Sequence, residues 1–287
     1  MPSFFLSPQA AVCYFVCMHW KRWLTAIVAL PLLFLLILKG GALLFTLFVS
    51  AVAVVTLWEY FRIVFSNHEP TVHWFYAWWT YAFGAGLVLG VHAYGFGVMM
   101  AFLTAHFIGA AVMSIFRFKL TQDAPVVVLK QVFGLFYIPL FLSCLVPLYN
   151  DGQGIHWVFL LFLIIVMGDT GAYYAGSYLG RHKLCPAVSP KKTIEGAVGG
   201  LTASLLIAFF YKLLFIPVLS VPAVLLFAAI VGAVGQVGDL FESEFKRAAG
   251  VKDSGRLLPG HGGFLDRIDA LLFAIPTAYL LKEYLLS

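Results

Sequence analysis

The sequence predicts an all-α, polytopic integral membrane protein. Of its 287 residues, 62% are hydrophobic and only 11% are charged, and the mean hydropathy is +0.95. A soluble domain carries roughly 25% charged residues, so most of this surface must face lipid. The net charge of +5 suits basic loops beside anionic headgroups and gives no reason to expect a nucleic-acid partner.

A helix needs about 20 apolar residues to cross a bilayer, and the chain offers about nine such segments. Residues 1–23 precede them and read as an interfacial lead-in, because Lys21 and Arg22 follow the apolar part, unlike in a signal peptide. The candidate helices are 24–38, 42–64, 73–89, 93–115, 125–148, 156–179, 195–217, 221–243 and 265–285.

Basic residues gather in alternate loops, which predicts the topology. The loops around 90–92, 150–155 and 218–220 contain no Lys or Arg, and the turn at 39–41 holds only Lys39. Basic loops stay on the cytoplasmic side. Nine spans then place the N-terminus inside and the C-terminus outside. The protein is expected in the cell inner (plasma) membrane, with its long charged loops facing the cytoplasm.

Acidic residues are unevenly distributed along the chain. Of the thirteen Asp and Glu residues, eight lie between 169 and 269. Residues 1–150 are therefore predicted to be a transmembrane scaffold, and residues 151–287 a catalytic transmembrane region with cytoplasmic loops. We find no internal repeat, which disfavours an inverted-repeat transporter.

The first charged segment of the catalytic region is MGDTGAYYAGSYLG, residues 167–180. Asp169 lies in otherwise apolar sequence, and a carboxylate at membrane depth is costly unless it is paired or functional. Gly176 and Gly180 have the spacing of small residues at a helix–helix contact, so they could serve packing alone.

The second segment is SPKKTIEG, residues 189–196. Its Ser-Pro pair predicts a turn, and Thr193 is predicted to cap the next helix. Two adjacent lysines near a helix N-terminus attract phosphate. A solvated basic loop would also explain the lysines, but not an acidic residue entering the membrane segment. The candidate substrate-binding residues here are Ser189, Lys191, Lys192, Thr193 and Glu195.

The third segment begins at GQVGDLFESEFKR, where Asp239, Glu242 and Lys246 share one helical face. Asp266 and Asp269 are three residues apart at the start of the last helix and also share a face. Two carboxylates on each of two neighbouring helices suit a hard divalent cation such as Mg²⁺.

A glycine turn, PGHGGFLDRIDA, precedes this last pair of carboxylates. Gly260, Gly262 and Gly263 suit a tight turn whose amides face an anion, and His261 could bind phosphate or be structural. Metal-binding aspartates, basic residues and glycine turns at the membrane edge predict phosphoryl or nucleotidyl transfer. No Walker A motif is present.

The segment SEFKRAAGVKDSGRLLPGHGGFLDRID, residues 243–269, resembles the signature of the phosphatidate cytidylyltransferases, also called CDP-diacylglycerol synthases. SPKKTIEG and GDTGAYYAGSYLG are similar to two further motifs of that family. The residues in register with the signature are Ser243, Lys246, Arg247, Lys252, Asp253, Gly255, Leu258, Pro259, His261, Gly262, Gly263, Asp266, Arg267 and Asp269.

The resemblance implies a reaction, a cofactor and an assembly. CTP and phosphatidate would give CDP-diacylglycerol and pyrophosphate, with Mg²⁺ required and K⁺ as a second ion beside it. The family's metal ligands correspond to Asp239 and Asp266, and Asp269 joins them as a candidate ligand. About nine helices and a homodimer are also implied.

The remaining candidate residues have assigned roles in this scheme. Asp253 is left open between a metal contact and an ion pair with a basic neighbour. Asp169, Ser243, His261, Gly262 and Gly263 are candidate substrate-binding residues. The candidate catalytic residues are Asp239, Lys246, Arg247, Lys252, Asp253, Asp266 and Arg267.

Two other classes of protein remain as alternatives. A CTP-dependent lipid kinase of the dolichol kinase type would transfer the γ-phosphate and release CDP. A cation-coupled transporter would use Asp169 and Asp239 as ion sites, but the charge of this chain gathers at one membrane face.

Overall fold

The computed structural model describes residues 27, 29–65, 70–118, 123–255, 257 and 262–286. A short apolar helix, Ala29–Lys39, comes first. The predicted all-α class is confirmed. The helices that follow are α2 (Gly41–Val64), α3 (Pro70–Tyr94), α4 (Val98–Arg117), α5 (Ala124–Leu135), η1 (Phe136–Leu140), α6 (Phe141–Ser143), α7 (Leu145–Asn150), α8 (Gly154–Leu179), α9 (Ile194–Phe215), α10 (Val221–Ala248) and α11 (Leu265–Leu285).

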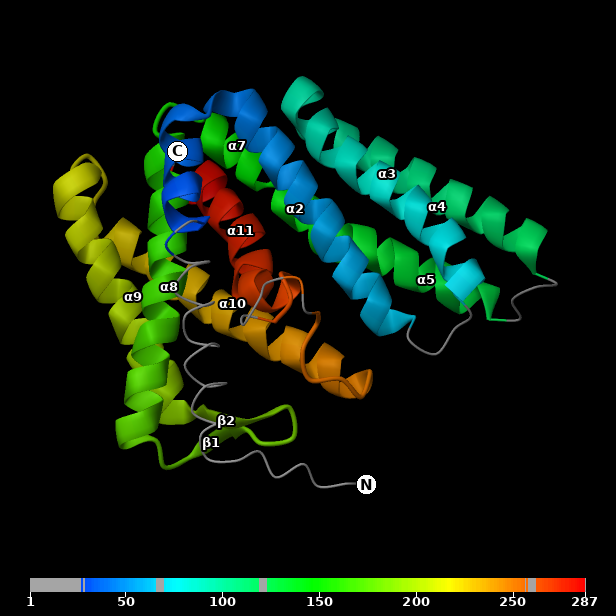
Figure 1. Cartoon of the computed structure of the whole chain (residues 1–287). Helices are drawn as coiled ribbons and strands as arrows, with labels where there is room; N and C mark the ends of the chain where they lie inside the picture. Colours follow the sequence, from blue (N-terminus) through cyan, green and yellow to red (C-terminus); the bar gives the residue numbers. More distant parts are fainter. Residues whose placement is uncertain are drawn as a thin grey trace.

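The helices form a broad bundle (Figure 1). Helices α8 and α9 pack together on one side of the bundle, and α3 and α4 lie on the opposite side. Helix α10 runs obliquely between these sides and packs against α8, α9 and α11. A hairpin of two antiparallel strands, β1 (Lys183–Cys185) and β2 (Ser189–Thr193), lies at the end of α8 and joins it to α9.

One apolar core includes residues from both halves of the chain. Helix α2 contributes Leu57, Tyr60 and Phe61, whose side chains are almost fully buried. The ring of Phe245 on α10 stacks on Tyr60, with ring centroids 5.4 Å apart. Helix α2 of the scaffold half therefore supports the end of α10, where the charged signature begins.

The predicted span 125–148 is one helical path with an irregular centre. Pro139 lies inside it, and proline removes a backbone donor and crowds the preceding turn. The chain responds with a π-helical turn, Phe136–Leu140, between α5 and α6. A Cβ added to Gly84 of α3 would lie 2.9 Å from Pro139 Cγ, so glycine lets α3 approach this irregular turn closely.

Two predicted turns lie elsewhere in the structure. The prediction of a loop around 90–92 is wrong, because α3 continues to Tyr94. The helix break falls at 95–97, where Gly95 has φ +75°. That break also contains no Lys or Arg. The prediction of a turn at Ser189 is also wrong. Residues 186–188 make the turn, and Ser189 begins β2.

The protein is a multi-pass membrane protein. Six helical segments in the described ranges are long and apolar enough to span a bilayer. Helices α3 and α11 are not among them, and the count of nine spans and the side of the N-terminus stay predictions. The six segments are Gly41–Val64, Val98–Phe116, Ala124–Asn150, Gly154–Leu179, Ile194–Phe215 and Val221–Ala248.

Candidate active site

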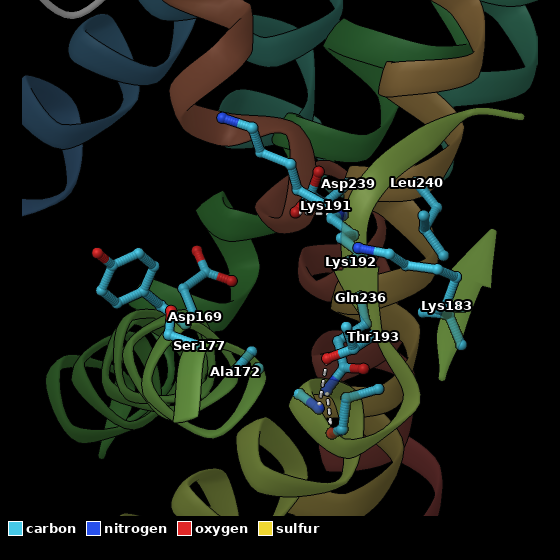
Figure 2. Close-up of a pocket in the computed structure, with 15 residues that line it drawn as sticks. Asp169, Ala172, Ser177, Lys183, Lys191, Lys192, Thr193, Gln236, Asp239 and Leu240 are labelled. Atoms are coloured by element: carbon cyan, nitrogen blue, oxygen red, sulfur yellow. Dashed lines mark hydrogen bonds and ion pairs between the residues drawn. The ribbon is translucent and has the colours of Figure 1, made fainter. Parts of the chain in front are cut away.

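A cavity of about 470 Å³ lies between the end of α8, the hairpin, the start of α9 and the middle of α10. Its wall combines basic and acidic side chains with apolar ones (Figure 2). The lining residues are Asp169, Ala172, Tyr173, Gly176, Ser177, Lys183, Leu184, Lys191, Lys192, Thr193, Gly196, Ala197, Gln236, Asp239 and Leu240.

The N-cap of α9 holds one end of this cavity in shape. The hydroxyl of Thr193 accepts a hydrogen bond from the amide of Gly196 at 3.1 Å, which confirms the predicted cap. Glu195 points away from the cavity: its carboxylate accepts from the amides of Arg181 and His182 and pairs with His182 Nδ1 at 2.6 Å. The structure thus places Glu195 where it ties the end of α8 to the start of α9.

A lysine and an aspartate join two walls of the cavity. Lys192 Nζ on β2 lies 2.6 Å from Asp239 Oδ2 on α10, and each side chain is about a quarter exposed, at 28% and 27%. Asp169 on α8 faces the same region, where it interacts electrostatically with Asp239, Lys192 and Arg267. The three segments predicted from the sequence therefore meet at this cavity.

A second charged group, separate from the Lys192–Asp239 pair, lies where α10 packs against α11. Lys246 Nζ sits 2.6 Å from Glu242 Oε2 and 2.7 Å from Asp266 Oδ1. All three side chains are mostly buried, at 12%, 1% and 8% exposed respectively. One ammonium group thus lies between two buried carboxyl groups in a low-dielectric setting.

Asp266 also accepts hydrogen bonds from backbone amides. Ser254 N lies 3.2 and 3.1 Å from its two oxygens, and Gly263 N lies 2.8 Å from Oδ2. Gly262 has φ +83°, a left-handed conformation that favours glycine. The anion that the amide of Gly263 faces in this structure is therefore Asp266 of the protein itself.

Asp269 lies one turn further along α11 and experiences the charges of Asp239, Glu242 and Asp169. The two helices approach closely here, because a Cβ on Gly238 would lie 2.9 Å from the carbonyl oxygen of Asp269. The carboxylates that the sequence predicted on neighbouring helices therefore do gather around one helix contact.

The chemistry of these donors fits a hard cation, since all are carboxyl oxygens. Their arrangement is that of an ion-pair network. In the described ranges, no three His, Cys, Asp or Glu side chains form a group with metal-site geometry. Asp239 pairs with Lys192, and Asp266 pairs with Lys246. The ligand set Asp239, Asp266 and Asp269 remains a prediction.

The other predicted residues surround this centre. Arg247 donates to the carbonyls of Val188 and Val251, both at 3.4 Å, and so links the hairpin turn to the end of α10. Lys252 and Asp253 are exposed on the loop after α10, Arg267 is exposed on α11, and Ser243 is half-buried on α10. His261 lies outside the described residues, as does Gly260.

The sequence reasoning missed three polar residues of this region, and one of them, Lys183, lines the cavity from the hairpin. Gln236 lines the cavity, and its amide donates to the carbonyl of Ala197 at 3.0 Å. Glu59 on α2 is fully buried and contacts the glycine turn. A signal for Glu59 was available, because it is a lone carboxylate inside an apolar span.

Known proteins resemble this chain at the level of sequence. The family model described as "Cytidylyltransferase family" matches residues 20–285. Three relatives are named phosphatidate cytidylyltransferase. They come from Staphylococcus saprophyticus subsp. saprophyticus (46% identical over 129 residues), Staphylococcus haemolyticus (48% over 130) and Staphylococcus aureus strain COL (49% over 131).

Each of these alignments covers 45% of this chain and 50% of the relative, so the match spans about half the length of the curated relatives. The family model extends much further, over nearly the whole chain and both halves of the bundle. Taken with the charged helix contact and its cavity, this match shows that the protein belongs to the cytidylyltransferase family.

Proposed function

We propose that this protein transfers the cytidylyl group of CTP to phosphatidate, giving CDP-diacylglycerol and pyrophosphate. The observation that carries the proposal is the cavity at the ends of apolar helices. It lies beside two lysine–carboxylate groups, the half-buried Lys192–Asp239 pair and the buried Lys246–Asp266 pair. Membership of the cytidylyltransferase family and the names of the Staphylococcus relatives support it.

The proposed reaction needs little acid–base chemistry from the protein. The phosphomonoester of phosphatidate has a second pKa near about 6, by analogy with phosphoserine, and is largely a dianion at neutral pH. One of its oxygens attacks the α-phosphorus of CTP. A new P–O bond forms as the bond to the β-phosphate breaks, and that electron pair leaves with pyrophosphate. The main barrier is repulsion between two polyanions.

Basic side chains of the site are placed to reduce this repulsion. Lys183, Lys191 and Lys192 line the cavity and would bind phosphate groups of either substrate. Lys246 keeps Asp266 in place, and Arg247 joins the hairpin to α10. Arg267 and Lys252 are exposed nearby and complete the proposed ring of positive charge.

Magnesium is the proposed cofactor, with K⁺ as a second ion. Asp239 and Asp266 would hold the divalent ion, and Asp269, one turn further along α11, is the third candidate ligand. The bound ion would neutralise negative charge on the phosphate groups of the substrates. Both aspartates lie on helices that pack closely at Gly238, which is a rigid base for such a site.

The membrane setting suits substrates of unequal polarity. The acyl chains of phosphatidate would stay among the apolar helices while CTP arrives from water. We propose that the site faces the cytoplasm of the cell, in the plasma membrane, and that the protein acts as a homodimer. Nucleic acid is not an expected partner.

Labelled CTP tests the proposal with purified protein in phosphatidate-containing vesicles. Label on the α-phosphorus should enter lipid, and label on the γ-phosphorus should leave in pyrophosphate. Entry of γ-label into lipid, with release of CDP, would instead show a lipid kinase. Absence of both, together with cation flux in proteoliposomes, would indicate a transporter. Chelation by EDTA should stop the transfer, and added Mg²⁺ should restore it.

A further inference from the structure

Glu59 of helix α2 is fully buried. It contacts both ends of the segment from Ser254 to Leu265, which we call the signature loop. Its Oε2 accepts a hydrogen bond from the amide of Leu265 at 2.7 Å and from the hydroxyl of Ser254 at 3.3 Å. These partners lie 206 and 195 residues away in the sequence. They are the first residue of α11 and a residue near the start of the loop before it.

The two glycines beside these partners leave space for the Glu59 carboxylate. A Cβ added to Gly255 would lie 2.5 Å from Glu59 Oε1, and all three of its nearest neighbours are atoms of Glu59. A Cβ on Gly263 would lie 2.7 Å from Glu59 Oε2 and would also clash with Ser254 Oγ. Neither glycine has a positive φ, so the close approach, not the backbone conformation, requires them.

Ser254 connects this carboxylate to the candidate active site. Its hydroxyl donates to Glu59, and its amide donates to both oxygens of Asp266. Asp266 in turn pairs with Lys246. Glu59 and Asp266 thus both bind Ser254, one through its hydroxyl and the other through its amide, so a displacement of Ser254 would alter the contacts of both carboxyl groups.

We propose that Glu59 is a positioning residue, whose buried carboxylate anchors both ends of the signature loop and so fixes Asp266 and Lys246. It does not line the cavity, so it acts through Ser254 and Leu265. The catalytic part of this inference rests on the proposed function, whereas the anchoring part does not.

Limited trypsin digestion of the purified full-length protein tests the anchor without any assay of activity. Lys252 is exposed on the loop after α10, two residues before Ser254, and the exposed Lys183 on the hairpin is an internal reference. Losing the buried hydrogen bonds of Glu59 should raise cleavage after Lys252 about tenfold or more in Glu59→Ala, because cleavage follows local opening. Cleavage after Lys183 should be unchanged.

Two further variants test whether faster cleavage results from a general loss of structure instead of the loss of the Glu59 contacts. Glu59→Gln keeps an oxygen that can accept from the amide of Leu265, so its cleavage should fall between those of the wild type and Glu59→Ala. Thr56→Val removes a buried hydroxyl one turn away that bonds only to Val52 in the described structure, and should leave cleavage after Lys252 unchanged.

A double-mutant cycle gives the sharpest test. Gly255→Ala should speed cleavage after Lys252 in the wild type but add little in the Glu59→Ala background, because the three atoms nearest to its new Cβ all belong to the Glu59 side chain. Gly263→Ala should speed cleavage in both backgrounds, since Ser254 Oγ and Gly255 N still block it. Additive effects for Gly255→Ala, or unchanged cleavage in Glu59→Ala, would overturn the proposal.

Enzyme kinetics test the positioning role of Glu59 separately from the proposed cytidylyl transfer itself. In Glu59→Gln we expect kcat for cytidylyl transfer to fall about tenfold while KM for CTP changes little, because the cavity wall is untouched. If Glu59→Ala loosens the loop but the wild-type protein transfers no cytidylyl group, the anchor stands and the proposed function is refuted. A loosened loop with unchanged kcat in an active enzyme would refute the positioning role.

Discussion

Lys192 of the hairpin and Asp239 of helix α10 form an ion pair of 2.6 Å across the wall of the candidate active site. The two residues come from motifs separated by helix α9 and the first part of α10. Their pairing makes the hairpin part of the site, and the same wall includes Thr193, which caps α9. A substrate phosphate that binds Lys192 would therefore compete with Asp239 for this lysine.

Replacing Asp239 tests its place at the centre of the site. We expect Asp239→Asn to lower cytidylyl transfer by about a hundredfold or more, because the site loses the charge that holds Lys192 and would hold a cation. Incorporation of α-labelled CTP into lipid measures the effect. Glu244→Gln, an exposed acid on the same helix, is the matched control and should stay near wild type. Equal activity in both variants would remove Asp239 from the site.

Asp266→Asn should abolish turnover while the protein still inserts and extracts normally. In the described part of the chain, both oxygens of Asp266 accept hydrogen bonds, from the Lys246 ammonium and from the amides of Ser254 and Gly263. The new amide nitrogen is a donor too, so it must face one of them without a hydrogen bond. Activity close to wild type would refute the metal role of Asp266 and its importance to the loop.

Removing Lys246 should damage stability as well as activity. Lys246→Met leaves Glu242 and Asp266 buried together without their shared cation, and breaking a buried pair costs about 3–5 kcal/mol. The apparent Tm in detergent should fall by several degrees. Lys39→Met, which removes an exposed lysine, should leave Tm nearly unchanged. A Tm for Lys246→Met that matches this control would show that the buried network contributes nothing to stability.

Much of this architecture was predictable, because lipid imposes strong rules on sequence. The last helix begins and ends where the apolar run predicts, at Leu265 and Leu285, and Thr193 caps α9 as its position suggests. The shared face of Asp239, Glu242 and Lys246 follows from helical spacing alone. The structure adds that Lys246 pairs with Glu242 and Asp266, and that Asp239 pairs with Lys192 instead.

The unpredicted parts depend on contacts between segments distant in sequence. No local pattern links Glu59 to Leu265, which lies 206 residues away. The hairpin was missed because Lys183–Cys185 is only three residues long and carries no alternating pattern. The glycines of the signature were read as amides facing a substrate, whereas the amide of Gly263 faces Asp266 in the structure.

Gly262 can be tested against Gly250, because both have a left-handed conformation. Their φ values are +83° and +70°, so an alanine should strain the backbone similarly at each, by about 1 kcal/mol. Only at Gly262 would the new Cβ also meet Asp266, 2.9 Å from Oδ2, whereas the space around Gly250 is open. Gly262→Ala should therefore lower kcat well below that of Gly250→Ala, and equal kcat values would contradict this placement of the turn.

An ion pair at the opposite end of α11 gives a pH-dependent prediction. Lys282 on α11 pairs with Asp151 in the loop before α8, and this contact holds the pKa of the Asp151 carboxyl below its usual value. A carboxyl with a lowered pKa in the folded state stabilises the fold above its unfolded pKa of about 3.9, and this stabilisation is lost as the pH falls through the folded value.

Asp151→Asn should therefore lower the apparent Tm slightly at neutral pH, by an amount equivalent to less than about 1 kcal/mol for this partly exposed pair. The difference from wild type should shrink as the pH falls below about 4, because the Asp151 carboxyl of the wild type is progressively protonated there. Cytidylyl transfer should be unchanged, because the pair lies far along α11 from Asp266. Melting curves across this pH range test the prediction, and a Tm difference that grows toward low pH would contradict it.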